Sequence, residues 1–365
     1  MAIKIKGPLM KILSTILLLV FVTFLPFSNS AFSKEENNLP NVTIITTGGT
    51  IAEKIDPKTG GAVPALSGKD LIAAIPSLAK IANIDVVNFC NIDSSQMTPE
   101  IWAGLSKKTD ELLSNPKIKG VVITHGTDTM AEGAYFLNLT LKSEKPVVVV
   151  GAMRSAAELS ADGPDNISNA VRQVCSDNAQ DWGVTLTMNQ YINSARDVRK
   201  TQTTNVQTFN CGEKGYLGYI SMNKVKRFHD APSQVKLDIP EKLPKVDVIA
   251  DFAGADGSLI RYSVDNGSKG IVVVGVGAGN VNDNVYGAIK YALSKNIPVV
   301  LTSRVFNGSV EPIYADQGGG ATLKKAGVIL GGDLIPFKAR LLLMLVIPQA
   351  ESDMEKIKEI FARTL

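Results

Sequence analysis

Two apolar segments that stop abruptly in glycine and threonine constrain the fold of this chain most strongly. They are Asn41-Val-Thr-Ile-Ile-Thr-Thr-Gly-Gly-Thr-Ile-Ala52 and Gly120-Val-Val-Ile-Thr-His-Gly-Thr-Asp-Thr-Met130. Runs rich in β-branched residues are typical of central strands in a parallel sheet, and the glycines allow a sharp exit at the carboxyl end. Open α/β sheets bind ligands at that edge. We therefore expect the hydroxyls of Thr50 and Thr127, with Asp128 beside the second, to lie close together.

Apolar runs alternate with helix-like stretches along the rest of the chain, which is typical of α/β proteins with a parallel sheet. The expected elements are 42–46, 71–82, 86–89, 99–113, 121–124, 130–141, 147–150, 165–176, 183–188 and 218–221, then 246–250, 270–274, 281–293, 298–302, 341–345 and 354–361. Thr98 followed by Pro99 marks one helix start. The alternation of apolar runs and helix-like stretches is lost at 223–244, where we predict a linker. A larger N-terminal parallel-sheet domain at 34–222 and a smaller C-terminal α/β domain at 245–365 follow from this pattern.

The first 33 residues are predicted to be a signal peptide and leader rather than part of the fold. Lys4, Lys6 and Lys11 form a basic start, 12–24 is apolar, and 28–31 is a run of small residues suited to cleavage. The alternative is a membrane anchor, but the apolar stretch is shorter than the roughly 20 residues a span needs. We expect a periplasmic or secreted protein with no membrane attachment after cleavage.

Charge and cysteine content exclude several classes of partner. The chain has 38 basic and 35 acidic side chains, and the three lysines of the predicted signal peptide account for the whole excess. A balanced mature chain lacks the basic surplus typical of nucleic-acid-binding proteins. Cys90, Cys175 and Cys211 allow at most one disulfide within the chain, and their spacing matches no metal site. We favour buried free thiols over a disulfide.

Histidine chemistry is poorly supported, because the chain has only His125 and His229. A Ser-His-Asp hydrolase needs a histidine base. His229 lies in the polar stretch and is predicted to be at the surface. His125 follows a strand, and a neutral imidazole bonded to the backbone is the favoured interpretation.

Threonine is the better candidate nucleophile, provided that a base removes its proton and backbone N–H groups hold the oxyanion. Thr50 after two glycines suits this role, whereas Asp128 could instead cap the helix that begins near Met130. Lys200, in a polar stretch rich in hydroxyls, could accept a proton if desolvated, although spacing alone favours a solvated loop lysine.

Two further motifs have ordinary structural explanations. Arg154 and Asp162 could form a structural ion pair. The run Gly275-Val-Gly-Ala-Gly279 is similar to a dinucleotide-binding fingerprint, but Asn280 occupies its sixth position, where glycine or alanine is expected. A nicotinamide site is therefore not expected.

Several motifs taken together resemble the bacterial type II L-asparaginases, the periplasmic branch of the asparaginase/glutaminase family. They are Thr46-Thr-Gly-Gly-Thr-Ile-Ala52, His125-Gly-Thr-Asp-Thr129, Gly151-Ala-Met-Arg154, Ser160-Ala-Asp-Gly-Pro164 and Arg196-Asp-Val-Arg-Lys200, and the match runs from about Leu39 to the C-terminus. The resemblance implies hydrolysis of L-asparagine to L-aspartate and ammonia by a threonine nucleophile, with no metal and no organic cofactor. It also implies a homotetramer built from close dimers, with each active site near the partner's C-terminal domain.

The resemblance also implies roles for individual residues. Thr50 is similar to the family's primary nucleophile, and Thr127, Asp128 and Lys200 to its second catalytic group, in which Lys200 and Asp128 polarise the Thr127 hydroxyl. The implied substrate-binding residues are Ser94 and Ser95 for the α-carboxylate, Asp128 for the ammonium, and the backbone of Ala152 for the side-chain amide.

Three departures from the family pattern bear on the site. Many relatives carry a tyrosine in the lid after the first threonine motif, but 53–67 contains none, and Tyr262 of a neighbouring subunit is a candidate replacement. Gly254 aligns with an asparagine that many relatives present from the partner subunit. Glu311 is the nearest candidate for the partner-subunit glutamate.

Two alternatives to an asparaginase remain open at the level of sequence. A mixed glutaminase-asparaginase would also accept L-glutamine, since one methylene typically changes selectivity by only about 1–3 kcal/mol. An exported amino-acid-binding protein would share the signal peptide and two α/β domains. Such a binding protein would have no use for two hydroxyls backed by lysine and aspartate.

Overall fold

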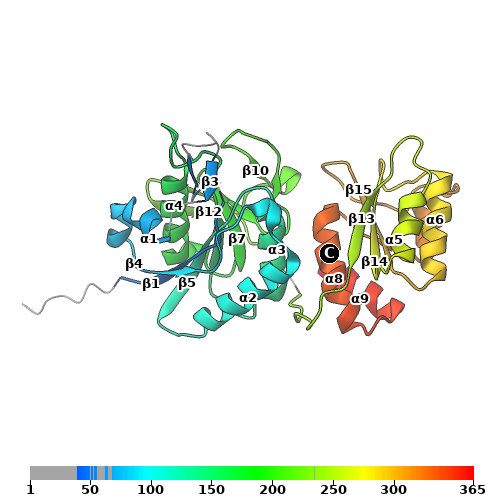
Figure 1. Cartoon of the computed structure of the whole chain (residues 1–365), viewed down its shortest axis with the longest axis horizontal. Coiled ribbons are helices and arrows are strands. Elements are labelled where there is room, and N and C mark those ends of the chain that lie inside the picture. Colours follow the sequence, from blue (N-terminus) through cyan, green and yellow to red (C-terminus); the bar gives the residue numbers. More distant parts are fainter. Residues whose placement is uncertain (1–38, 50, 52, 56–61, 65–67, 234) are drawn as a thin grey trace, which may run out of the picture. The chain divides into compact units, whose positions relative to one another are not determined.

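The computed structural model describes residues 39–365 except 50, 52, 56–61, 65–67 and 234. Within this range an N-terminal domain contains an eight-stranded sheet in the order β12-β11-β8-β7-β6-β5-β1-β4 (Figure 1). Its strands are β1 (Asn41–Thr46), β4 (Asn83–Asn88), β5 (Ile118–Thr124), β6 (Val147–Val150), β7 (Val184–Met188), β8 (Tyr191–Ser194), β11 (Gly218–Ser221) and β12 (Lys224–Arg227). The pairs from β4 to β7 are parallel, and those from β7 to β12 are antiparallel.

Helices cover both faces of this sheet. They are α1 (Gly68–Ala73), α2 (Pro99–Leu113), α3 (Met130–Thr140) and α4 (Gly163–Cys175), with the short 3-10 turns η2 (Pro76–Lys80), η3 (Ser94–Gln96), η4 (Asp177–Ala179) and η5 (Gly212–Lys214). Two small two-stranded sheets pair β2 (Glu53–Ile55) with β3 (Ala62–Pro64), and β9 (Arg199–Lys200) with β10 (Phe209–Asn210). The predicted cap is confirmed, since the Thr98 hydroxyl accepts from the Ile101 N–H at the start of α2.

The C-terminal domain has a four-stranded parallel sheet in the sequential order β13-β14-β15-β16. Figure 1 shows α8 on one face and α5 and α6 on the other, with α9 against α8. The elements are β13 (Val246–Ala250), β14 (Gly270–Gly275), β15 (Val299–Ser303), β16 (Ile329–Leu330), α5 (Ser258–Asp265), α6 (Asp283–Ser294), α7 (Gly320–Lys325), α8 (Pro336–Gln349) and α9 (Met354–Thr364). The predicted fold class, a larger and a smaller α/β domain, is therefore confirmed.

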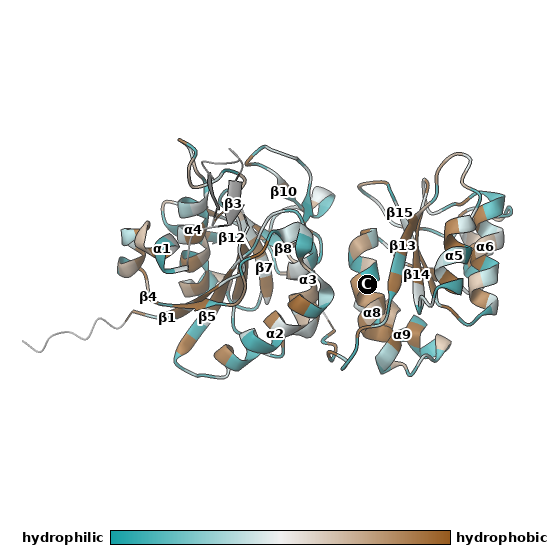
Figure 2. Ribbon diagram, in the orientation of Figure 1, coloured by the Kyte–Doolittle hydropathy of each residue, from teal (hydrophilic) through white to brown (hydrophobic). Residues whose placement is uncertain are grey.

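Central strands are mostly hydrophobic and buried, because both of their faces are covered. All six residues of β14 are buried, as are six of the seven in β5. Figure 2 shows this concentration of hydrophobic residues along β5 and β14. In the part of the chain that the structure describes, no helix combines the length and apolar character required to span a bilayer.

Three local differences from the sequence prediction have physical reasons. The helix expected at 71–82 is broken into α1 and η2, because Pro76 cannot continue a helix. Strand β12 lies inside the stretch predicted as linker, since its single buried residue, Val225, gave too weak a pattern. Helix α5 was missed because its buried residues are few.

The three cysteines are free thiols, as the sequence analysis favoured. Cys211 is buried, while Cys90 and Cys175 are partly buried. Burial raises the pKa of Cys175 to about 11 and that of Cys211 to about 12. These thiols therefore stay protonated and unreactive at neutral pH.

Candidate active site

The exits of β1 and β5 lie against each other at the carboxyl edge of the N-terminal sheet. Gly48 and Gly49 have φ of 103° and 82°, a conformation that side chains disfavour. A Cβ on Gly49 would lie 2.4 Å from the Gly126 Cα, so only glycine permits this approach. The close contact brings the two threonine motifs together, as the sequence analysis expected. Thr50 itself lies outside the described residues.

A short turn after β4 completes this edge. Ser94 in η3 is buried, and its hydroxyl accepts from the Asp128 N–H at 3.3 Å. The Thr129 hydroxyl donates to the Ser94 carbonyl at 2.8 Å. Ser95 is exposed and donates its N–H to the Asp93 carboxylate at 2.8 Å. The serine turn is therefore fixed to the exit of β5.

Lys200 reaches this edge from the small β9-β10 sheet. Its Nζ donates to Thr127 Oγ1 at 2.9 Å and to Asp128 Oδ1 at 2.6 Å. Its side chain is 20% exposed, so the interpretation as a solvated loop lysine is wrong. The helix cap proposed for Asp128 is also absent, because Thr129 is the N-cap of α3 and no side chain caps it.

His125 is a structural residue beneath the site. Its Nδ1 lies 2.7 Å from the Gly126 carbonyl, and its Nε2 accepts from Trp102 Nε1 at 3.1 Å. Complete burial lowers its pKa to about 4. The imidazole is thus neutral at physiological pH and bonded to the backbone, which confirms the favoured interpretation.

The exit of β6 contributes a backbone platform next to His125. Ala152 is buried, and the Met153 and Arg154 N–H groups donate to the Asp162 carboxylate at 2.9 to 3.1 Å. Arg154 donates from its guanidinium to the Ser160 carbonyl. No ion pair joins Arg154 and Asp162 in the described part of the chain, so Asp162 acts by holding the backbone.

These groups surround an open cleft of about 470 Å³. Its lining residues are Gly49, Asp93, Ser94, Gly126, Thr127, Asp128, Met153, Lys200 and Thr203. Ser94, Thr127, Asp128 and Lys200 were predicted, whereas Ser95 and Ala152 lie beside the cleft rather than on its lining. Asp93, Met153 and Thr203 were not singled out, although Met153 lies in the quoted motif 151–154, Asp93 precedes Ser94, and Thr203 follows Lys200 by three residues.

The arrangement is suited to polar chemistry on a small ligand. Thr127 offers a hydroxyl whose oxygen is polarised by a lysine, and Asp128 and Ser94 offer an acceptor and a hydroxyl. Among the described residues, no group of three or more histidine, cysteine, aspartate or glutamate side chains is placed to hold a metal ion.

Comparison with known proteins agrees with this geometry. Residues 41–233 match the family model for the N-terminal domain of asparaginase, and 245–361 match the model for the glutaminase/asparaginase C-terminal domain. The chain belongs to the asparaginase family.

Its relatives in this family are similar over most of their length. The chain is 39% identical to L-asparaginase 2 of Escherichia coli, covering 90% of this chain and 95% of the relative. It is 40% identical to a probable periplasmic L-asparaginase of Haemophilus influenzae, covering 89% and 93%. The crystal structure of a probable cytoplasmic L-asparaginase from Campylobacter jejuni superposes with a TM-score of 0.80 at 42% identity, covering 88% of this chain and 99% of that one. Family members are thus named for two different compartments.

Proposed function

We propose that this protein is an amidohydrolase that converts L-asparagine and water to L-aspartate and ammonia. The observation that carries the proposal is the contact of Lys200 with both Thr127 and Asp128 at the point where β1 and β5 leave the sheet. Names of the similar proteins support asparagine as the substrate.

In the proposed reaction Thr50 Oγ attacks the side-chain amide carbon and gives up its proton, the C–N bond breaks, and the leaving nitrogen takes up that proton and departs as ammonia. Water then hydrolyses the resulting ester, which releases L-aspartate and restores the hydroxyl. Thr127, Asp128 and Lys200 form the second catalytic group. Lys200 donates to Thr127 Oγ1 and thereby stabilises negative charge on that oxygen, while Asp128 balances the ammonium charge.

Substrate recognition is proposed to use the other groups around the cleft. The α-carboxylate would bind the hydroxyl and backbone donors of Ser94 and Ser95, and the α-ammonium would bind the Asp128 carboxylate. The backbone of Ala152 would contact the side-chain amide. The polar lining of the cleft supports a zwitterionic ligand of this size.

We further propose that copies of the chain associate as a homotetramer and that a partner's C-terminal domain contributes to each site. Phe252, in the segment between β13 and α5, and Leu259 and Tyr262, on α5, are all more than half exposed. Exposed apolar groups in one region are typical of an association surface. Gly254, in the same segment, has open space where a Cβ would lie, and Glu311 is exposed in a later loop.

Export is proposed from residues 1–33, which lie outside the described residues. The basic start, apolar run and small-residue stretch support a cleaved signal peptide and a periplasmic or secreted location. N-terminal sequencing of the protein recovered from the culture medium or periplasm would test this.

Ammonia release from L-asparagine and from L-glutamine, measured separately from micromolar to millimolar substrate, tests the activity. Much faster release from asparagine supports the proposal, and comparable rates would make the protein a mixed glutaminase-asparaginase. Tight binding with no release from either would indicate an amino-acid-binding protein. Thr50→Ala should lower turnover by orders of magnitude with the fold intact, and a fully active variant would remove Thr50 from the mechanism.

A further inference from the structure

A buried lysine outside the cleft has an unusual set of partners. Lys338, near the start of α8, is fully buried, and its Nζ donates to the carbonyls of Ala195, Arg196 and Val198 at 2.9, 2.9 and 2.7 Å. Only an ammonium has three hydrogens to donate, so this geometry requires the charged form. Burial opposes the charge and lowers the pKa of Lys338 to about 7.

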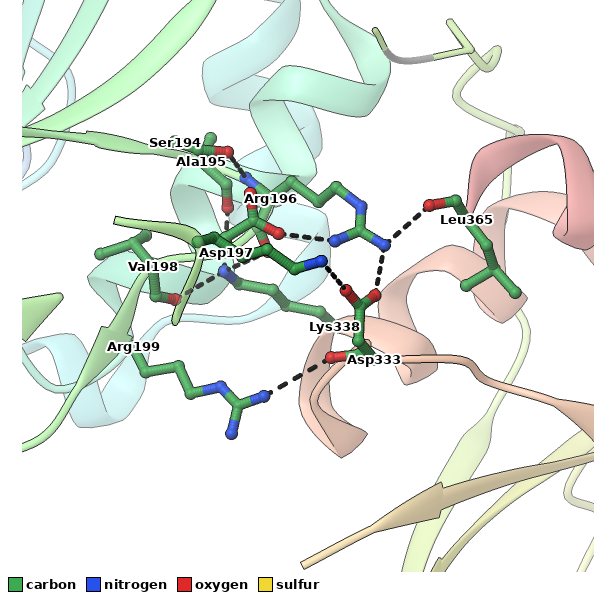
Figure 3. A network of polar contacts seen from close by, with 10 residues as sticks. Ser194, Ala195, Arg196, Asp197, Val198, Arg199, Asp333, Lys338 and Leu365 are labelled. Carbon is green, nitrogen blue, oxygen red and sulfur yellow. Dashed lines mark hydrogen bonds and ion pairs between the residues drawn. The ribbon is translucent and has the colours of Figure 1, made fainter. Parts of the chain in front are cut away.

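Arg196 also anchors this turn to the C-terminal domain, through its side chain. Its guanidinium donates to Asp197 and Asp333 at 2.5 Å each, and to the Leu365 oxygen at 2.7 Å. Figure 3 shows Lys338 and Asp333 reaching the 195–199 turn together from the C-terminal domain. The 195–199 turn is therefore bonded to the C-terminal domain both through its backbone carbonyls and through the Arg196 side chain.

This turn leads directly into the strand that carries Lys200. Val198, whose carbonyl makes the shortest bond to Lys338, is only two residues before Lys200 in the sequence. Arg199 between them also donates to the Asp333 carbonyl, at 3.5 Å. The C-terminal domain thus fixes the backbone immediately before the Lys200 side chain.

Lys338 also packs against α3, the helix that follows Thr127, the partner of Lys200. Its Nζ lies 5.7 Å from the centre of the Tyr135 ring, and Tyr135 is fully buried in α3. Helix α3 begins at Met130, two residues after Asp128. One side chain therefore joins the two segments whose separation sets the distance from Lys200 Nζ to Thr127 Oγ1.

We propose that Lys338 is a positioning residue that sets the contact of Lys200 with Thr127 by holding the 195–199 turn against α3. The inference rests on the proposed function, in which that contact is catalytic. Displacing a reacting group by about 1 Å can cost about 100-fold in rate. Loss of the three hydrogen bonds that hold the backbone just before Lys200 would allow a displacement of this size.

The test replaces Lys338 by methionine, which keeps the apolar stem and removes all three donors. We expect kcat per folded enzyme to fall about 10- to 100-fold, with a smaller change in KM. In the double variant with Lys200→Met, kcat should be no lower than in Lys200→Met alone, since both changes remove the same contact. A multiplied loss would overturn the proposal, because it would mean that Lys338 acts on some other feature.

Lys236→Met is the matched control. Lys236 also donates to a backbone carbonyl, that of Asn138 near the far end of α3, but among the described residues it makes no hydrogen bond to the 195–199 turn. Its replacement should leave kcat within about 2-fold of wild type. Asp333→Asn supplies a milder second variant if Lys338→Met does not fold. It should lower kcat several-fold, and combining it with Lys200→Met should lower kcat no further than Lys200→Met alone.

Crystal structures of these variants separate the inference from the proposed function. In Lys338→Met or Asp333→Asn, we expect the distance from Lys200 Nζ to Thr127 Oγ1 to lengthen beyond hydrogen-bonding range from its present 2.9 Å. An unchanged distance would overturn the positioning role whatever the activity. Absence of ammonia release from the wild-type enzyme would instead remove the proposed function, with the positional result still decided by the structures.

Discussion

The carboxyl edges of the two parallel sheets differ although both are built from buried apolar strands covered by helices. At the N-terminal edge, Lys200 and Thr127 meet at an open polar cleft. At the C-terminal edge, Asp251 follows β13 and its carboxylate accepts from both the N–H and the side-chain amide of Asn282. The Asp251 carboxylate is therefore used in fastening the loop after β13 to the start of α6.

Strand order accounts for the position of the cleft at the N-terminal edge. In the N-terminal sheet, β4 lies on one side of β1 and β5 on the other, so the chain reverses direction across the sheet at β1 and β5. Loops leave in opposite directions at such a switch point, and a crevice opens between them. The C-terminal sheet runs in sequential order with no reversal among its described strands, and the cavity at its edge, about 320 Å³, is lined mainly by apolar residues.

Two matched threonine substitutions test this contrast most strongly. Thr127→Val should lower kcat by about 10³-fold, because it removes the hydroxyl that Lys200 contacts. Thr302→Val removes a buried hydroxyl at the C-terminal edge, where it donates to the Val273 carbonyl, and should cost about 1 kcal/mol of stability with kcat unchanged. Steady-state kinetics and denaturant unfolding measure both effects. Equal losses of kcat in the two variants would remove the distinction between the edges.

The sequence predicted which segments meet at the carboxyl edge of the N-terminal sheet, but it did not predict the side-chain contacts there equally well. Apolar runs that end in glycine and threonine identified β1, β5 and the meeting of their exits, since these signals are local. Lys200 could not be placed by spacing, because its contact with Thr127 spans 73 residues and depends on a two-residue strand. Family resemblance, rather than periodicity, identified that lysine.

Buried charge was the least predictable feature. Lys338 lies in a mostly apolar helix, and nothing in its sequence neighbours indicates that three carbonyls from a distant turn surround it. Strand β12 was likewise hidden, because one buried residue in four gives no recognisable alternation. The surroundings of Lys338 and the pairing of β12 both depend on contacts between residues far apart in the sequence, which a local pattern does not report.

Glycine substitutions sharpen the comparison through stability. Gly49→Ala should cost about 3 kcal/mol or more, since the new Cβ adds strain at φ 82° to a clash with the Gly126 backbone. Gly267→Ala, at φ 85° in the C-terminal domain, would place its Cβ in open space and should cost only about 1 kcal/mol of backbone strain. Denaturant unfolding measures both. Similar costs would show that the close approach of β1 and β5 contributes little.

Acid should weaken the N-terminal domain through His125. Its pKa is about 4 in the fold against an ordinary value of 6.5, so between these values the unfolded chain binds a proton that the native chain does not. Stability is therefore lost as pH falls from about 6.5 to about 4. The full difference corresponds to about 3 kcal/mol at 1.36 kcal/mol per pKa unit.

Unfolding free energies measured across this pH range should show a shallower slope for His125→Gln than for wild type. His229→Gln, which removes an exposed histidine, should keep the wild-type slope. A wild-type slope in His125→Gln would mean that other groups cause the acid sensitivity.

The smallest expected effect concerns whether the C-terminal domain contributes a group to a neighbouring copy's site. Tyr262 is 65% exposed on α5, and the lid segment 53–67 contains no tyrosine to orient Thr50. If its hydroxyl bonds the nucleophile across a subunit boundary, Tyr262→Phe should lower kcat about 5-fold, the value of one net hydrogen bond of about 1 kcal/mol. Tyr286→Phe on α6 is the control and should leave kcat unchanged. An unchanged rate in both variants would leave the C-terminal domain with only a structural role toward the cleft, the one exerted through Lys338 and Asp333.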